Sequence, residues 1–156
     1  MASDAIVRKG DDSRALWFLG GLYEIVVSGD ETNGKATVMR FTVPAGTGSP
    51  PHTHPGEESM YVLDGELNVH IGDDVVAAKP GSSFYFPAGT REFFEADTQT
   101  TLLVTYIPGG IDKFFTEVAE PALTRTLPPP SKTPPDMERI IRIAATHGMN
   151  IEAPPH

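Results

Sequence analysis

The chain contains no cysteine among its 156 residues. This absence excludes disulfide bonds, thiolate metal ligands and cysteine nucleophiles. Basic residues are also scarce, with 12 lysines and arginines against 21 aspartates and glutamates and a formal net charge of −9. Because a surface of this sign repels phosphate backbones and anionic lipids, we expect neither a nucleic-acid partner nor a membrane partner.

Long hydrophobic runs are missing as well. No apolar stretch approaches the ~18 residues of a membrane-spanning helix, and the N-terminus lacks the charged, apolar and small-residue pattern of a signal peptide. Together with the absence of cysteine, this predicts a cytoplasmic protein. The length suits a single domain with a hydrophobic core.

Glycine and proline are abundant, with 15 of each, and they mark turns between short β-like segments. Within one segment, Thr37, Met39, Phe41 and Val43 fall on the same face of an extended backbone. Short strands at this spacing predict a β-sandwich or barrel. The predicted strands are 23–28, 36–43, 59–63, 66–71, 75–78, 82–86, 91–95 and 101–107.

The end of the chain has a different character. Five of the nine residues in 127–135 are proline, which predicts a stiff, extended connector. Residues 136–147 then form a predicted helix, with Thr133 as its capping residue and Gly148 as its stop signal. The helix carries an apolar stripe, so we expect it to pack on the barrel or on a second subunit. The stripe consists of Met137, Ile140, Ile141 and Ala144.

Two histidines and a glutamate have the spacing of a metal site. On an extended backbone, His52 and His54 point to the same side because they are two residues apart. Glu58 lies four residues further on, at the start of the next predicted strand, from which its carboxylate can return to the same point. Two imidazoles and a carboxylate are suitable ligands for divalent iron, manganese, nickel, cobalt or copper.

This segment resembles the first cupin motif, and residues 80–92 resemble the second. The matching positions are Gly46, His52, His54, Glu58 and Gly65, followed by Gly81, Pro87 and Gly89. The chain is also similar to the quercetin 2,3-dioxygenase-like branch at Trp17–Gly20, at Pro108–Phe115 and in its late helix. The resemblance implies an all-β fold, a single cupin jelly-roll β-barrel with a C-terminal helix. The barrel and N-terminal strands would occupy residues 1–116, and the connector and helix residues 117–156.

The resemblance also implies a function. It suggests a metal-dependent, quercetinase-like enzyme that acts on a phenolic or polyketide-like small molecule, holds a divalent transition metal and forms a homodimer. By position, Glu58 would serve as metal ligand and general base, while Glu57 would point to solvent. The candidate pocket residues are Phe41, Met60, Phe84, Phe86, Phe93 and Tyr106. We expect His70, His147 and His156 to lie away from this centre.

The chain departs from the second motif at Glu92, where the motif has a third histidine. Three interpretations remain open. Glu92 could be a fourth metal ligand, it could act as an acid or base beside a metal held by the other three residues, or the site could be metal-free. In the last case Glu92 would form a hydrogen bond or an ion pair, either with Arg91 or with a neighbouring strand.

The substitution also changes the charge expected at the centre. Two imidazoles and two carboxylates leave a divalent site neutral, whereas three imidazoles and one carboxylate leave it at +1. Losing one unit charge at about 4 Å costs an anionic substrate roughly 4 kcal/mol at an effective dielectric near 20. The charge argument therefore favours a non-oxidative alternative, a cyclase, isomerase or dehydratase that uses Glu58 and Glu92 as acid and base. A separate alternative is a non-catalytic protein that binds a small molecule.

Overall fold

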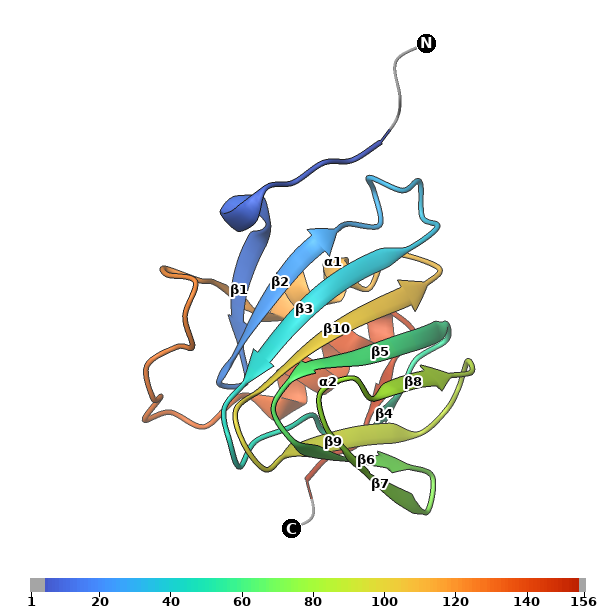
Figure 1. Cartoon of the computed structure of the whole chain (residues 1–156), viewed down its shortest axis with the longest axis vertical. Helices are drawn as coiled ribbons and strands as arrows, with labels where there is room; N and C mark the ends of the chain where they lie inside the picture. The colour runs from blue at the N-terminus through green and yellow to red at the C-terminus, as the bar shows by residue number, and fades with distance from the viewer. Residues whose placement is uncertain (1–4, 155–156) are drawn as a thin grey trace.

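Two antiparallel β-sheets make up most of the computed structural model, which describes residues 5–154. The first sheet has the strand order β11-β1-β2-β3-β10-β5-β8, and the second has the order β12-β4-β9-β6-β7 (Figure 1). The first sheet consists of β1 (Arg14–Phe18), β2 (Gly21–Val27), β3 (Thr37–Val43), β5 (Glu57–Asp64), β8 (Ser83–Phe86), β10 (Thr100–Ile107) and β11 (Glu120–Pro121). The second consists of β4 (His52–Thr53), β6 (Leu67–Ile71), β7 (Asp74–Ala78), β9 (Glu92–Ala96) and β12 (Asn150–Ile151). This arrangement confirms the predicted all-β jelly-roll barrel.

Alternation along the central strands builds the interior of the barrel. In β3, the predicted face with Met39 and Phe41 is buried, and the intervening residues are more exposed. The same period of two runs through β5, where Glu58 is buried and Glu57 is exposed. Because successive side chains of a strand point to opposite faces, this alternation directs only one of the two neighbouring glutamates into the barrel.

The second sheet brings the end of the chain to the cupin-like segment. His52 in β4 lies directly opposite Glu92 in β9 in an antiparallel pair. On its other side, β4 pairs with β12, where Ile151 lies opposite His52. Residues about one hundred positions apart in the sequence therefore line the same part of the barrel.

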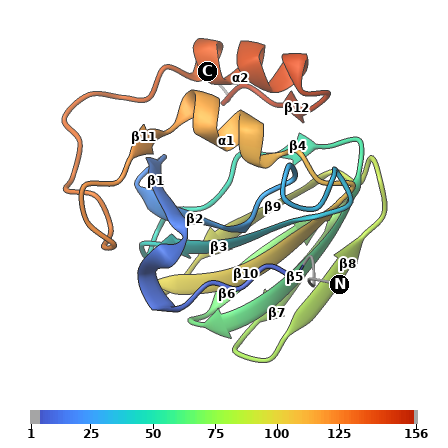
Figure 2. The same cartoon turned by 90° about the horizontal axis from the view of Figure 1, so that it is seen from above.

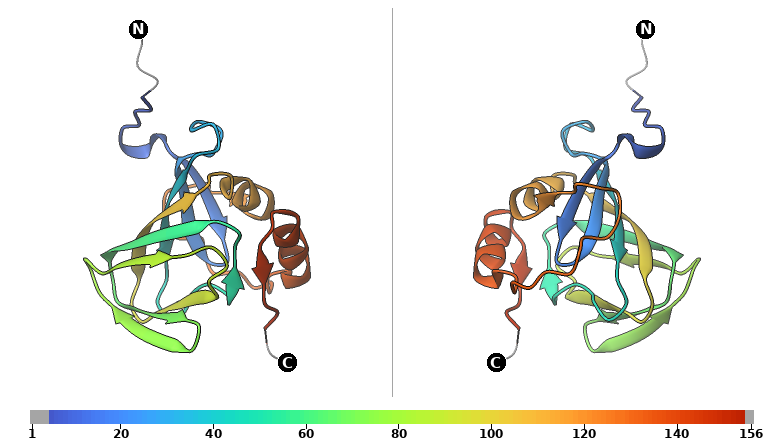
Figure 3. Two further views of the ribbon diagram at one scale, coloured as in Figure 1. Left: turned by 90° about the vertical axis from the view of Figure 1, so that its right-hand side faces the viewer. Right: turned by 90° about the vertical axis from the view of Figure 1, so that its left-hand side faces the viewer.

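Two helices cover one side of the barrel, α1 (Asp112–Val118) and α2 (Met137–Thr146) (Figures 2 and 3). Phe114 and Phe115 of α1 are buried, as are Ile140 and Ala144 of α2. Helix α2 is the predicted C-terminal helix. Neither helix in residues 5–154 is long and apolar enough to cross a membrane.

The predicted capping residue of α2 is wrong. The N-cap is Asp136, whose side-chain oxygen accepts a hydrogen bond from the backbone N–H of Arg139 at 3.0 Å. Thr133 lies three residues too early to reach the free N–H groups of the first turn. The helix also ends one residue earlier than predicted, because His147 is its C-cap.

The proline-rich segment before α2 has no regular secondary structure. Residues 127–135 contain no helix or strand, in line with the predicted connector. The division of the chain at residue 116 stays a prediction. The terminal His156 lies outside the described residues.

Asp112 ties the first helix to the barrel, and its loss should destabilise the fold. The buried carboxylate accepts hydrogen bonds from the Gly29 N–H at 3.0 Å and from the Thr37 hydroxyl at 2.8 Å. Asp112→Ala leaves both donors without this acceptor, so we expect the free energy of unfolding to fall by about 1–3 kcal/mol. Urea denaturation measures this change.

Asp30 provides the matched control for this prediction. Its side chain is 81% exposed and forms an ion pair with Lys113 at 3.2 Å. Exposed pairs contribute little, so Asp30→Ala should change the free energy of unfolding by no more than about 1 kcal/mol. Equal losses in the two variants would show that Asp112 has no special structural role.

Candidate metal centre

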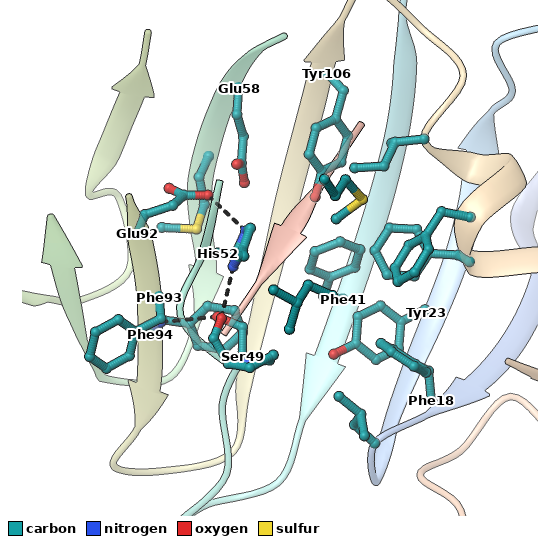
Figure 4. Close-up of a pocket in the computed structure, with 18 of the residues that line it drawn as sticks. Phe18, Tyr23, Phe41, Ser49, His52, Glu58, Glu92, Phe93, Phe94 and Tyr106 are labelled. Atoms are coloured by element: carbon teal, nitrogen blue, oxygen red, sulfur yellow. Dashed lines mark hydrogen bonds and ion pairs between the residues drawn. The ribbon is translucent and has the colours of Figure 1, made fainter. Parts of the chain in front are cut away.

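Four potential metal ligands converge from different parts of the fold. His52 comes from β4, His54 from the loop that follows it, Glu58 from β5 and Glu92 from β9. One ligand atom from each residue lies within 4.8 Å of all the others. His52 retains 15% side-chain exposure and the other three retain 6% or less. Figure 4 shows His52, Glu58 and Glu92 at one end of a pocket.

Backbone carbonyl groups orient both imidazole rings. Nδ1 of His52 lies 2.8 Å from the carbonyl oxygen of Pro50, and Nδ1 of His54 lies 3.0 Å from that of Gly56. A carbonyl oxygen can only accept, so each Nδ1 carries the hydrogen and each Nε2 faces the cluster. Such an outer hydrogen bond is the usual way in which a metal-binding histidine is held in the correct tautomer.

The two glutamates have opposite electrostatic environments. Nε2 of His54 lies 2.6 Å from Oε2 of Glu58, while Oε1 of Glu92 lies 3.3 Å from Nε2 of His52 and 3.6 Å from Nε2 of His54. Burial, followed by the hydrogen-bonded carboxyl group of Glu92, raises the pKa of Glu58 well above its usual range. Burial also acts against ionisation of Glu92, but hydrogen bonds from Glu58 and the two histidines prevail and lower its pKa to about 2.

His54 has a proton-binding environment as well. Burial alone favours its neutral form, but hydrogen bonds to Glu58 and Glu92 and their negative charges prevail and raise the pKa of His54 to about 10. The cluster therefore binds protons where negative charge would otherwise accumulate. A divalent cation can take the place of these protons, and two imidazole nitrogens with two carboxylates form a suitable donor set for a transition metal. The residues present thus fit a metal ion.

Metal affinity is expected to rise with pH through the neutral range. His54 and Glu58, whose pKa values are both raised, hold protons that a metal must displace. Each displaced proton makes the apparent affinity rise about tenfold per pH unit. Competition with a chromophoric chelator between about pH 6 and pH 8 measures the slope, and calorimetry in two buffers counts the released protons. An affinity independent of pH would contradict this description of the cluster.

An aromatic cavity extends from three of the four ligands, His52, Glu58 and Glu92. Its volume is about 60 Å³, whereas an apolar cavity of about 150 Å³ accommodates benzene. A ring-shaped ligand must therefore displace part of the wall. Several aromatic side chains form this wall, namely Phe18, Tyr23, Phe41, Phe93, Phe94, Tyr106, Phe114 and Phe115.

The predicted pocket residues divide into two groups. Phe41, Met60, Phe93 and Tyr106 line the cavity. Phe84 and Phe86 are not among its described lining residues. Their rings instead stack on each other in β8, with centroids 5.9 Å apart.

Sequence reasoning missed much of the opposite wall. Tyr23 is contributed by β2, and Phe114 and Phe115 come from α1. Ile151 of β12 completes the wall from the end of the chain. In the sequence, this wall is indicated only by the resemblance of Trp17–Gly20 and Pro108–Phe115 to the quercetinase-like branch. The first segment ends three residues before Tyr23, and the second contains Phe114 and Phe115.

The remaining histidines have other partners. His70 stacks on Phe93 with centroids 4.0 Å apart and contacts Glu95 at 3.1 Å. His147 contacts Glu117 at 2.9 Å, but it also lines a second cavity of about 240 Å³ together with His54. The placement of His147 is therefore closer to the centre than expected.

Glu57 and Arg91, which precede Glu58 and Glu92 in the sequence, point away from the cluster. Glu57 is exposed. Arg91 forms two hydrogen bonds with Glu152, at 2.7 and 2.8 Å, and the partners of Glu92 are the histidines and Glu58. Of the two suggested partners of Glu92, Arg91 is therefore wrong, because its side chain lies against the C-terminal segment. The neighbouring strand β4 does provide a partner, His52, at 3.3 Å.

Comparison with known proteins agrees with the fold. Residues 39–108 match the family model described as a cupin domain. Over 102 residues, 64% of this chain, the sequence is 26% identical to quercetin 2,3-dioxygenase of Bacillus subtilis. The matched region is 30% of that protein, so the chain corresponds to less than a third of this relative.

Solved structures extend the same comparison. An RmlC-like cupin from Shewanella frigidimarina has a TM-score of 0.61 and 17% identity, with 70% of this chain and 96% of that chain covered. The polyketide cyclase RemF from Streptomyces resistomycificus has a TM-score of 0.58 and 19% identity, with 66% of this chain and 80% of that chain covered. The similar proteins therefore share a cupin fold and include enzymes.

Proposed function

We propose that this cupin-fold chain is a metal-dependent enzyme that acts on a phenolic or polyketide-like small molecule. The observation that carries the proposal is the cluster of His52, His54, Glu58 and Glu92 at one end of an aromatic cavity. The resemblance to a quercetin 2,3-dioxygenase supports this class of substrate. We propose that Glu92 is the fourth ligand, in the place of the third histidine of the motif.

The residues of the cavity would divide the work among them. A bound divalent metal would supply the positive charge that holds an ionised phenol or enol oxygen. Glu58 lies in the cavity wall and, once the metal has displaced its proton, its carboxylate would take the proton from that hydroxyl group. The aromatic wall would hold the ring of the substrate and exclude water.

A non-oxidative reaction in the same cavity is the second candidate. The observation that favours it is the opposite displacement of the pKa values of Glu58 and Glu92, since such a pair can divide the roles of acid and base. The Glu92 substitution and the structural similarity to a polyketide cyclase are consistent with this reading. Cyclisation, isomerisation or dehydration would then need no dioxygen.

Metal analysis combined with an oxygen electrode tests the proposed function. Mildly purified protein should contain about one transition-metal ion per chain, and turnover of phenolic compounds should consume dioxygen. Turnover that continues under anaerobic conditions would select the non-oxidative reaction instead. Absence of a stoichiometric metal would refute the metal-dependent enzyme. A ligand recovered unchanged, with an affinity that Glu58→Gln leaves intact, would identify a binding protein.

The homodimer and the cytoplasmic location stay predictions.

A further inference from the structure

Two cavities of different size meet at three side chains. The aromatic cavity beside the metal cluster has a volume of about 60 Å³, and the second cavity, which touches His54 and His147, has a volume of about 240 Å³. Tyr106, Ile111 and Met149 line both of them. These three residues therefore form a partition between an inner cavity, which holds the aromatic wall, and an outer cavity.

The outer cavity leads to the protein surface. Pro55, Glu57 and Pro108 line it and are exposed, whereas every described residue that lines the inner cavity is buried or half-buried. The outer cavity is also larger than the cavity of about 150 Å³ that accommodates benzene, and the inner cavity is much smaller. A ring-shaped molecule therefore fits the outer cavity as it stands, but it reaches the inner cavity only if a side chain of the partition moves.

Of the three partition residues, Met149 has the most freedom to move. Tyr106 is held in β10, and its ring packs edge-on against His54 at 5.6 Å between centroids. Ile111 is the N-cap of α1, and its branched Cβ restricts the side chain. Met149 lies in the turn between α2 and β12, and its unbranched side chain has three rotatable bonds. The Met149 N–H donates to the carbonyl of Ala144 at 3.0 Å, so the side chain can turn while the backbone stays bound to α2.

The opposite end of the inner cavity is held more firmly. Figure 4 shows Ser49 and Phe18 on the side away from Tyr106. The Ser49 N–H donates to the carbonyl of Phe94, and the Phe94 N–H donates to the hydroxyl of Ser49, both at 3.1 Å. The Phe18 ring packs edge-on against three further aromatic rings, with centroids 5.5 to 6.1 Å apart. Opening this end would break these contacts, whereas turning the Met149 side chain breaks no hydrogen bond.

We infer that the outer cavity is the entrance to the metal centre and that the Met149 side chain is its gate. When this side chain turns away from Tyr106 and Ile111, the two cavities become one, and the joined cavity has the space for a ring that the inner cavity lacks. Use of the entrance by a substrate rests on the proposed function. The entrance itself requires neither that class of substrate nor a bound metal, so it can be tested separately.

A buried thiol tests this route in the whole chain as purified, because the chain has no cysteine of its own. Val69 lines the inner cavity and is 1% exposed, and Val69→Cys introduces a thiol at little change in size. The rate at which this thiol reacts with 4,4′-dithiodipyridine, a neutral aromatic disulfide, measures how often a ring reaches the inner cavity. In this background, Met149→Ala should accelerate the reaction at least about tenfold, because it removes most of the gate. Met149→Ile should slow the reaction at least about threefold, because a side chain branched at Cβ is stiffer. Loss of structure cannot produce a slower reaction.

Two control variants in the same background separate the gate from other causes. Ile140→Ala removes a side chain of α2 that is 5% exposed and is not among the described lining residues of either cavity. It loosens the same helix, but it should change the rate by less than about threefold. Leu19→Ala truncates a half-buried lining residue next to Phe18, at the opposite end of the inner cavity, and should leave the rate within about twofold.

Three results would overturn the inference. Equal acceleration by Met149→Ala and Ile140→Ala would show that the thiol is reached through general loosening of α2. Acceleration by Leu19→Ala without acceleration by Met149→Ala would place the entrance at the opposite end. A thiol that stays unreactive in every variant would show that the outer cavity does not lead to the inner one. None of these results bears on the metal or on the class of substrate, which metal analysis and turnover test.

Discussion

His54→Ala is expected to weaken metal binding at least about 100-fold. Nε2 of His54 lies 2.6 Å from Oε2 of Glu58 and 3.6 Å from Oε1 of Glu92, so this ring occupies the middle of the cluster. Loss of an outer hydrogen bond to a metal ligand typically costs 10–100-fold in affinity, and loss of the ligand itself should cost more. Elemental analysis after dialysis and a competition titration with a chelator measure the change.

The control for this prediction is another histidine of the chain. His70 lies on β6, where its ring stacks on Phe93 and Nε2 contacts Glu95. His70→Ala should retain full metal content, because none of the four clustered ligand atoms belongs to this residue. An equal loss of metal from both variants would indicate general destabilisation, and full metal retention in His54→Ala would contradict the proposed centre.

Glu58→Gln is the second change with a large expected effect. The substitution keeps the size of the side chain but removes its ability to take a proton. General-base catalysis contributes about 10²–10⁴-fold to a rate, so turnover of a phenolic substrate should fall by that factor. Metal content must be measured alongside, since Glu58 is also a proposed ligand. The proton-transfer role is isolated in protein reloaded with metal, by comparing turnover per bound ion.

Glu57→Gln is the neighbouring control. Glu57 precedes Glu58 on the same strand but points to the exposed face, so its substitution should leave turnover within about twofold. Turnover that is unchanged in Glu58→Gln protein with full metal content would exclude Glu58 as the base.

Glu92→His is a further informative variant, because it restores the third histidine of the motif. A gain of oxygen-dependent activity would show that Glu92 marks a diverged function.

The parts of the fold that depend on local pattern were accessible from the sequence. Alternating burial in β3 and β5 follows the period of two that the sequence displays, and it also explains the different exposure of Glu57 and Glu58. The convergence of His52, His54 and Glu58 likewise follows from short-range spacing. Glu92 joins them across a strand pair, and it was singled out only by its position in the second motif.

The parts that depend on tertiary contacts were not accessible. The sequence of strand β1, Arg14–Phe18, does not alternate between polar and apolar residues, and only Leu16 is buried in the structure. Helix α1 is seven residues long, too short to display a clear helical repeat. Strand β12 has two residues and exists through its pairing with β4. These elements supply or flank the missing wall of the cavity, including Phe114 and Phe115.

The cap of α2 shows how local signals compete. Thr133 and Asp136 are both good capping residues, and the prolines at 134 and 135 suit a first helical turn. Asp136 is selected because its carboxylate reaches the N–H of Arg139. The helix begins at Met137 as a consequence, and the prolines stay in the connector.

The central claim is that His52, His54, Glu58 and Glu92 bind one transition-metal ion. Anomalous diffraction at the absorption edge of the metal, on crystals of mildly purified protein, tests it most directly. The predicted result is a single anomalous peak between these residues, ligated by Nε2 of both histidines and by an oxygen of each glutamate. A cluster without a peak in metal-supplemented crystals, or a peak ligated by other residues, would contradict the claim.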